Sequence, residues 1–497
     1  MGPEFFFVKS HNKERMKERK KMSFMAGWKS KYTENDSEST NSTIGNELEK
    51  QSSKKSFFKG WNSMSKRDMT EAEEQTNIED KDIIKDANHY LTDNANVARK
   101  LSDLGNRLKE KGSVGNMAKM SPFSLVSCLA AAAHFYKAIN ESHPEIRNNL
   151  YKESNREHFE KKELEKCSEW LDYADLAYEN KYDTLRKKLK KHNFTLMRHD
   201  TSAATGRVAH FIALNPERKI GLISLKGTST LSDVLTDALG NPIEISLENS
   251  FHPNYKSEKI TCHEGIYTAA AMMADDTLDI VEHLFMPLNY KIIICGHSLG
   301  AGTACLLGLL LRSRIPSMNK NYPLLVFAYA PPPVLNYDAC IASASFTTSI
   351  VNDTDMVPRM SIPNLWVMDK ILGKIKEALK TKQILPTNME RARAFSKQIS
   401  STGGENLLME PEEVDQLLQE AFAEDNIFDS SNLCVPGRVL CVYRKSTDKE
   451  ADEDVPNYDV IVTDGGAKVL RSVAFSKTGI SNHFLSAHRT SIDAILK

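Results

Sequence analysis

The sequence predicts an α/β fold with a largely parallel sheet, and the alternation of two patterns is the first reason. Short apolar runs that suit strands alternate with helical spacings of apolar residues from about residue 207 to residue 462, as in chains built from βαβ units. The second reason is composition, because 40% hydrophobic and 26% charged residues over 497 residues lie close to the globular average. At roughly 100–200 residues per domain this length allows two or three domains, so the chain can bury a large core.

The expected strands are the apolar runs at 207–214, 220–225, 290–295, 324–330, 346–351, 439–443 and 460–462. Helices are expected at 266–284 and 301–311. Residues 83–191 keep apolar residues three or four positions apart, which also indicates helices. Within them, residues 122–136 are apolar but fewer than the ~20 that span a bilayer, so a buried helix is expected there.

Charge patterning divides the chain into parts. Residues 1–70 hold 15 Lys and Arg against 9 Asp and Glu, whereas residues 71–94 hold 8 acidic residues against 2 lysines. The first of these segments has few aliphatic residues, which is typical of disorder. The expected division is a disordered basic tail at 1–75, a helical region at 76–190, and an α/β domain at 191–497, on which the helical region packs. A polar, partly helical insertion is expected within the α/β domain at 376–432.

Net charge, cysteines and the first residues argue against several classes of protein. The formal net charge is −1, so nucleic acid is not an expected partner. The eight cysteines are scattered and form no CxxC or CxxH pair, which gives a metal site such as structural zinc no support. Several fall in apolar runs, as free thiols do in a reducing compartment. No long apolar run of a secretory signal opens the chain, and we expect a cytoplasmic protein.

The most specific motif is GHSLG, from Gly296 to Gly300, which stands between an apolar strand and a helix of small residues. GxSxG alone recurs by chance, but this context suits a nucleophile elbow, in which a tight turn pushes the serine hydroxyl above the carboxyl edge of the sheet. The following helix N-terminus brings backbone N–H groups and a positive dipole end to the same point. Ser298 is therefore the predicted nucleophile.

A serine nucleophile needs a histidine base and an acid that orients the base. In α/β hydrolases the acid and then the base follow the serine along the chain. Of the histidines, His483 and His488 follow Ser298, and His483 is preferred because it stands in a turn-like stretch. Asp353 and Asp355 follow an expected strand, and Asp355 is preferred as the acid. Position alone leaves the other histidine and the other aspartate as alternatives.

Two backbone N–H groups are expected to hold the oxyanion. One belongs to Leu299, the residue after the nucleophile. The other should come from a loop after an earlier strand, and the strand at 220–225 ends in the polar run KGTST. Thr228 in that run is the predicted second donor, with its hydroxyl supporting the site.

Five motifs stand in order along this part of the chain. They are KGTST with Asp237 downstream, HEGI at 263–266, GHSLGAGTA at 296–304, FAYAPPP at 327–333 and DMVPR at 355–359. In this order they resemble the class 3 lipase family, and in particular its branch of sn-1-specific diacylglycerol lipases. The resemblance runs from about residue 207 to residue 360 and resumes at 435–439 and around His483.

The resemblance implies an α/β-hydrolase fold with Ser298, Asp355 and His483 as the catalytic triad, and Thr228 and Leu299 as oxyanion donors. It implies hydrolysis of an acyl ester of a glycerolipid, and for that branch the products are a monoacylglycerol and a free fatty acid. This chemistry requires neither a metal nor an organic cofactor. The motifs leave open a phospholipase A1 or triacylglycerol lipase of the same fold, and an inactive lipid-binding scaffold.

The basic tail contains one octapeptide pattern twice. Residues 23–30 and 56–63 share S-F-x-x-G-W-x-S, and each copy follows a pair of lysines. Aromatic rings beside lysines suit a membrane interface that contains anionic lipid. We expect the tail to attach the protein peripherally to a membrane. A protein-docking repeat and a chance similarity are the alternatives.

Overall fold

The computed structural model describes most of the chain beyond residue 114. The described residues are 115–142, 144–202, 207–228, 241–319, 323–401, 432–445, 458–472, 474–476 and 478–497. The expected tail at 1–75, with both copies of its repeat, lies outside them. So do Asp237 and residues 402–431 of the expected insertion.

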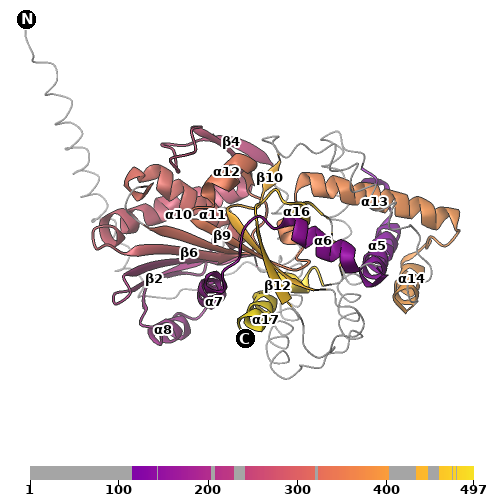
Figure 1. The fold of residues 1–497 in the computed structure, drawn as a ribbon, viewed down its shortest axis with the longest axis horizontal. Helices are drawn as coiled ribbons and strands as arrows, with labels where there is room; N and C mark the ends of the chain where they lie inside the picture. The colour runs from indigo at the N-terminus through magenta and orange to yellow at the C-terminus, as the bar shows by residue number, and fades with distance from the viewer. Residues whose placement is uncertain are drawn as a thin grey trace, which may run out of the picture. The chain divides into compact units, whose positions relative to one another are not determined.

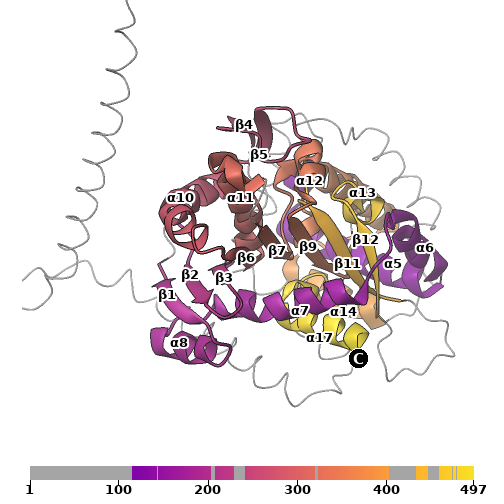
Figure 2. The same cartoon turned by 60° about the vertical axis from the view of Figure 1, so that its left-hand side comes forward.

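The main sheet is built from the apolar runs that the sequence marked. Its strands are β1 (Thr195–Asp200), β2 (His210–Asn215), β3 (Ile220–Leu225), β6 (Lys291–His297), β7 (Leu324–Tyr329), β9 (Thr347–Asn352), β11 (Arg438–Arg444) and β12 (Tyr458–Thr463). In the described part of the chain they lie in the order β1-β2-β3-β6-β7-β9-β11-β12 (Figures 1 and 2). The strands from β3 to β11 pair in parallel, and antiparallel strands flank them on both sides. The predicted α/β fold with a largely parallel sheet is confirmed.

Helices cover both faces of this sheet (Figures 1 and 2). On one face α10 (Glu264–Ile280) packs against α11 (Leu299–Arg314), and a single π-helical turn, Val281–Phe285, extends α10. On the opposite face α7 (Lys161–Leu176) and α17 (Leu485–Leu496) lie side by side. Separate clusters of buried apolar side chains fill the two interfaces. The sheet is therefore buried on both faces, which is the usual environment of parallel strands.

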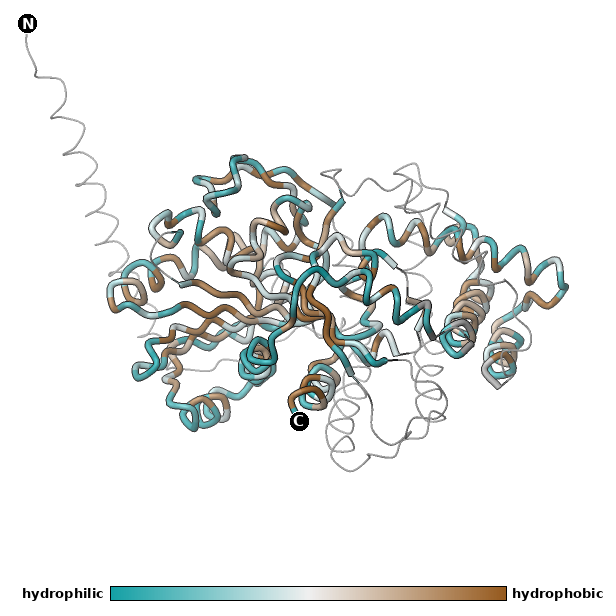
Figure 3. Tube along the Cα trace, viewed as in Figure 1, coloured by the Kyte–Doolittle hydropathy of each residue, from teal (hydrophilic) through white to brown (hydrophobic). Residues whose placement is uncertain are grey.

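The central strands explain why the sheet forms where the sequence predicts it. Every residue of β3 is buried, and in β6 the residue at the start, Lys291, is the one that is exposed. Figure 3 shows the hydrophobic colour running along the strands of the sheet. The register places Leu225 opposite Gly296, so β3 and β6 end at the same edge. Residues 226–228 follow the end of β3, the GHSLG motif spans the end of β6, and the two segments lie close together at this edge.

A second, four-stranded sheet was not expected from the sequence. Its strands, in spatial order, are β10 (Leu433–Cys434), β8 (Leu335–Asn336), β5 (Lys259–His263) and β4 (Pro242–Ser246). Strands of two to five residues are too short to show a reliable period in the sequence. The antiparallel edge strand β1 was missed for a related reason, since its residues are mostly half-exposed and form no apolar run.

Three helices form a layer with its own apolar core: α5 (Pro122–Ser142), α13 (Ile362–Thr381) and α14 (Met389–Ser401). α5 contains the segment that the sequence marked as a buried helix. α13 begins ahead of residue 376, where the insertion was expected to start, and continues through it. The reason is that buried apolar side chains recur along α13 on both sides of that position. None of the helices that the structure describes is long and apolar enough to cross a bilayer.

The remaining described helices are α6 (Pro144–Ser154), α8 (Tyr182–Lys190), α12 (Tyr337–Ser343), α16 (Lys468–Arg471) and the 3₁₀ turns Met117–Lys119, Pro316–Asn319, Val357–Arg359 and Ser481–His483. α6 packs against β12, and α7 packs against β6 and β7. Two helices of the region expected at 76–190 therefore lie against the main sheet.

Candidate active site

Ser298 lies at the sharp turn between β6 and α11. Its φ of 58° and ψ of −126° form a conformation that residues other than glycine rarely adopt. A Cβ at Gly296 would lie 2.5 Å from the carbonyl oxygen of Gly300, and a Cβ at Gly300 would lie 2.5 Å from the carbonyl oxygen of Leu225. Only glycine fits at either position, so the two glycines of the motif permit the turn that holds the serine.

The structure joins Ser298, His483 and Asp355 in one chain of hydrogen bonds. The Nε2 atom of His483 lies 2.9 Å from Oγ of Ser298. The Nδ1 atom lies 3.0 and 3.2 Å from the two carboxylate oxygens of Asp355. Exposure is 0% for Ser298, 4% for His483 and 0% for Asp355. The serine and the histidine are 185 positions apart, so the fold alone brings them together.

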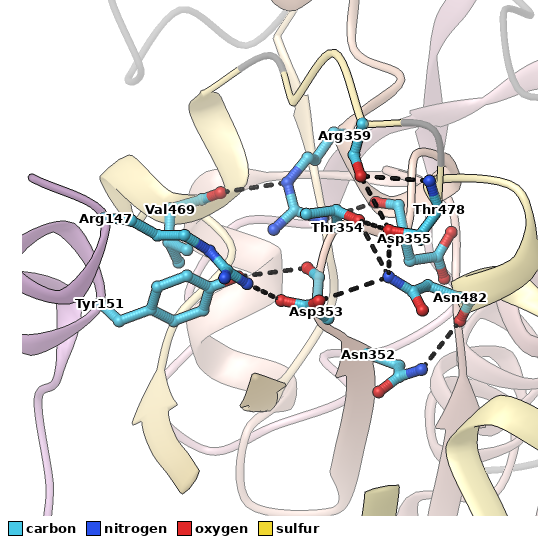
Figure 4. A network of polar contacts seen from close by, with 11 residues as sticks. Arg147, Tyr151, Asn352, Asp353, Thr354, Asp355, Arg359, Val469, Thr478 and Asn482 are labelled. Atoms are coloured by element: carbon cyan, nitrogen blue, oxygen red, sulfur yellow. Dashed lines mark hydrogen bonds and ion pairs between the residues drawn. The ribbon is translucent and has the colours of Figure 1, made fainter. Parts of the chain in front are cut away.

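Neighbouring groups fix the loop that carries Asp355. The backbone N–H of Val357 donates to Oδ1 of Asp355 at 3.0 Å. The buried Arg359 donates from Nη1 to the backbone carbonyl of Asp355 at 2.6 Å and from Nε to the carbonyl of Val469 at 3.3 Å (Figure 4). The DMVPR motif thus contains the aspartate and the arginine that anchors its main chain.

The other candidate acid, Asp353, faces a different partner. Its carboxylate forms an ion pair with Arg147 of α6 and accepts a hydrogen bond of 3.4 Å from Nδ2 of Asn482 (Figure 4). Its φ is 46°, in the left-handed region. Asp353 therefore connects α6 to the segment that precedes the histidine at 483, and the structure places Asp355 rather than Asp353 beside that imidazole.

The other candidate base, His488, is enclosed within α17. It is 0% exposed, and neither ring nitrogen has a hydrogen-bond partner among the described residues. Burial lowers the pKa of His488 to about 4, because charge on the ring would be desolvated. The structure does not bring His488 to Ser298.

Both predicted oxyanion donors lie in segments next to Ser298. Leu299 is the first residue of α11. In the loop after β3, a Cβ at Gly227 would lie 3.1 Å from Cβ of Ser298, so this loop touches the serine side chain. The hydroxyl of Thr228, the next residue, is buried and has no hydrogen-bond partner in the described part of the chain.

Sequence reasoning missed three side chains around this site: Arg147 in α6, Tyr178 after α7 and His297 before the serine. Arg147 is 206 positions from Asp353, and Tyr178 is 119 positions from His297, with which it forms a hydrogen bond. No local pattern marks a residue whose partner is so distant. His297 stands inside the GHSLG motif, which is the one signal that pointed to this group.

A comparison with protein families identifies this region. The family model described as lipase (class 3) matches residues 222–365. The match covers less than a third of the chain, and over these residues the chain is similar to class 3 lipases. The match includes Ser298 and Asp355, whereas His483, Arg147 and Tyr178 lie outside it.

The curated proteins that match part of this chain are named diacylglycerol lipases. Human diacylglycerol lipase-alpha is 30% identical over 164 residues, which are 31% of this chain and 15% of that protein. Mouse diacylglycerol lipase-beta is 28% identical over 160 residues, which are 31% of this chain and 22% of that protein. The chain spans less than a quarter of the length of either relative.

Fungal lipases are among the similar solved structures. The mono- and diacylglycerol lipase from Aspergillus oryzae is 21% identical, with 40% of this chain and 73% of that chain covered and a TM-score of 0.33. A deletion mutant of the Rhizomucor miehei lipase propeptide complex is 13% identical, with 67% of this chain and 81% of that chain covered and a TM-score of 0.41.

Proposed function

We propose that this chain is a serine hydrolase that cleaves an acyl ester of a glycerolipid, converting a diacylglycerol to a monoacylglycerol and a free fatty acid. The observation that carries the proposal is the 2.9 Å hydrogen bond between Oγ of Ser298 and Nε2 of His483, in a buried Ser-His-Asp chain. The class 3 lipase match supports a lipid ester as substrate. The names of the diacylglycerol lipase relatives support the choice of diacylglycerol.

In the proposed reaction His483 acts first as a base and then as an acid. Its Nε2 takes the proton of Ser298 as Oγ attacks the ester carbonyl carbon. Asp355 accepts a hydrogen bond from Nδ1, which fixes the tautomer and stabilises the imidazolium. His483 then gives the proton to the leaving glycerol oxygen, and an acyl-enzyme remains. Water that loses a proton to His483 hydrolyses the acyl-enzyme, which frees the fatty acid and restores the serine.

The backbone N–H groups of Leu299 and Thr228 are the proposed oxyanion donors. Two observations support them: Leu299 opens α11, and the loop of Thr228 touches the serine side chain through Gly227. Donors fixed before the reaction stabilise the charge that develops on the carbonyl oxygen, and loss of one typically costs ~10²–10³ in kcat. The N-terminal end of the α11 dipole adds to this field.

We also propose that the protein works in the cytoplasm, attached peripherally to a membrane by the basic tail at 1–75. The eight cysteines support a reducing compartment, because all are free and buried. Burial raises the pKa of Cys295 to about 12, so this thiol serves for packing rather than reactivity. The octapeptide pattern at 23–30 and 56–63, with a tryptophan in each copy, supports the membrane contact.

The substrate is tested by incubating the purified full chain with diacylglycerol, triacylglycerol and phosphatidylcholine side by side. We expect diacylglycerol to be cleaved fastest. Faster release of fatty acid from either of the other lipids would replace the proposed substrate. No cleavage of any of them, together with no labelling by a fluorophosphonate probe, would identify an inactive lipid-binding scaffold.

The nucleophile is tested by Ser298→Ala. We expect hydrolysis to fall by at least about 10³-fold and fluorophosphonate labelling to disappear. The melting temperature should change little, because the substitution removes one hydroxyl. Residual turnover within tenfold of the wild type would contradict the assignment of Ser298.

A further inference from the structure

The imidazole of His297, the residue before the nucleophile, contacts two groups that the proposed reaction does not use. Its Nδ1 lies 2.8 Å from the hydroxyl of Tyr178, and its Nε2 lies 2.7 Å from the backbone carbonyl of His483. The centroids of the imidazole rings of His297 and His483 are 4.7 Å apart. His297 is 6% exposed, so water does not replace these contacts.

The chemistry of the two partners fixes the proton on His297. A carbonyl oxygen only accepts, so Nε2 carries the hydrogen that is donated to His483. The ring is neutral, because burial and the neighbouring His483 hold the pKa of His297 well below its usual value. Nδ1 is then an acceptor, and the hydroxyl of Tyr178 is its donor. Burial also raises the pKa of Tyr178, which keeps this hydroxyl protonated.

Tyr178 has a second contact, on the other side of the site. The backbone of Gly227 lies against its hydroxyl, and the nearby backbone N–H of Gly227 favours the ionised phenol, which partly offsets the effect of burial on the pKa of Tyr178. The contact is tight, because a Cβ at Gly227 would lie 2.6 Å from the Tyr178 hydroxyl and 2.4 Å from the carbonyl oxygen of His297. The side chain of Tyr178 therefore connects the loop at 226–228 with His297.

The end of α7 supports Tyr178. It follows directly after α7, and its backbone N–H donates to the carbonyl of Asp175 at 3.0 Å. Trp170 and Tyr173 of the same helix are buried in the core beneath the main sheet. The continuous path runs from α7 through Tyr178 and His297 to the main chain of His483.

We propose that Tyr178 and His297 are positioning residues, which set the main chain of His483 and the loop at 226–228 relative to Ser298. The inference rests on the proposed hydrolase function. Because His483 Nε2 must stay within hydrogen-bond reach of Ser298 during both proton transfers, loss of this tether should lower kcat and leave KM nearly unchanged. Neither residue touches the reacting atoms.

The test compares two substitutions of His297. Each places an amide group at the position of a different ring nitrogen. In His297→Gln the amide nitrogen reaches the place of Nε2 and can still donate to the carbonyl of His483. In His297→Asn the amide reaches only the place of Nδ1. We expect His297→Gln to keep kcat within about tenfold of the wild type. His297→Asn should lose about 100-fold, as a misplacement of about 1 Å can. Equal kcat values in these two variants, or the reverse order, would overturn the inference.

Tyr178→Phe removes the hydroxyl alone and is the second variant. We expect kcat to fall by about tenfold, KM to stay within twofold and the melting temperature to stay near that of the wild type. The exposed Tyr182 provides the matched control, and Tyr182→Phe should behave as the wild type. A residue with a purely structural role would lower the melting temperature and leave kcat per folded molecule unchanged.

The outcomes separate this inference from the proposed function. If the wild type cleaves diacylglycerol and Tyr178→Phe has the same kcat, the positioning role is wrong and the hydrolase function stands. If the wild type neither cleaves lipid esters nor reacts with the fluorophosphonate, the proposed function fails, and the positioning role fails with it.

Discussion

At the scale of residues, the two candidate histidines differ in their surroundings more than in their place in the sequence. His483 stands between a hydroxyl and a carboxylate, both within hydrogen-bond distance. His488 packs edge-on against the ring of Tyr329. Its ring nitrogens have no hydrogen-bond partner among the residues that the structure describes. The first environment stabilises a transient imidazolium, and the second opposes any charge on the ring.

The first prediction concerns the base. His483→Ala should lower hydrolysis about as much as Ser298→Ala, because triad members act as a unit. His488→Leu, which keeps apolar volume in the core, should retain most activity. Hydrolysis rates of the two purified variants decide the matter, and loss of activity in His488→Leu alone would make His488 the base.

The second prediction concerns pH and follows from the depressed pKa of His488. The folded state binds this proton only near pH 4, whereas the unfolded state binds it near pH 6.5. The unfolded state therefore holds more protons between these values, and the free energy of unfolding should fall as the pH falls from about 6.5 to about 4. Urea unfolding at several pH values should show a shallower slope in His488→Leu. An unchanged slope would contradict the buried neutral state.

The third prediction separates the two aspartates. Asp355→Asn should lower kcat by about 10⁴-fold, because the imidazole loses the partner that fixes its tautomer. Asp353→Asn keeps the shape and tolerates a positive φ, so its effect on kcat should be mild. Asp353→Asn removes the charged partner of Arg147, whose side chain is 13% exposed. The loss of this ion pair should lower the free energy of unfolding by about 3 kcal/mol.

The control for this prediction is the double variant Asp353→Asn/Arg147→Met. Removing the unpaired cation should recover part of the lost stability, as measured by urea unfolding. If the double variant is as unstable as the sum of the two single variants, the pair makes no coupled contribution.

At the scale of elements, the packing of α13 shows that part of the insertion expected at 376–432 belongs to a core. Its buried residues Ile375 and Leu379 belong to the same apolar cluster as α5. Residues 376–401 therefore include the end of one packed helix and the whole of another, α14. The segment contributes no residue of the Ser-His-Asp chain, but part of it completes a core.

The fourth prediction follows from this packing. A polar insertion without triad candidates, as the sequence predicts at 376–432, is typically a dispensable surface segment. Because α13 and α14 pack on α5, deleting 376–432 should instead expose apolar side chains of α5 and lower the solubility and the melting temperature. A shorter deletion of 402–431, closed with a Gly/Ser linker, keeps α13 and α14 and should stay soluble and active. Equal melting temperatures for both deletions would show that the helical layer adds no stability.

At the scale of the whole molecule, the site is assembled from three stretches that are distant in the sequence. The class 3 lipase match at 222–365 supplies Ser298 and Asp355. The C-terminal segment supplies His483, and the helices α6 and α7 bring Arg147 and Tyr178 to its edge. A fragment limited to the matched residues would lack the histidine that completes the hydrogen-bonded chain.

The fifth prediction concerns the tail, which lies outside the described residues. The full chain should co-sediment with liposomes that contain phosphatidylserine, and a chain that begins at residue 76 should bind less. Trp28→Ala/Trp61→Ala should weaken binding as well, because the rings partition at headgroup depth while lysines meet anionic lipid. Equal binding by all three proteins would show that the tail is not the anchor.

The sequence by itself determined seven of the eight described strands of the main sheet and the turn that holds Ser298, because both depend on short-range patterns. Continuous apolar runs predicted seven strands, and each one is present in the sheet. Ser298 could be found because a strand, two glycines and a small-residue helix must be contiguous for the turn to form. The strands β4, β5, β8 and β10 were missed, because they are too short to have a recognisable period.

Only the tertiary structure decided between the paired candidates. Asp353 and Asp355 stand on the same loop, and their contacts differ because one faces Arg147 of α6 and the other faces His483. The same holds for His483 and His488, which the chain order allows equally. Tyr178 and Arg147 carry no local signal, since their partners are 119 and 206 positions away. Contacts between distant segments depend on how the helices pack on the sheet, and a one-dimensional pattern does not contain that geometry.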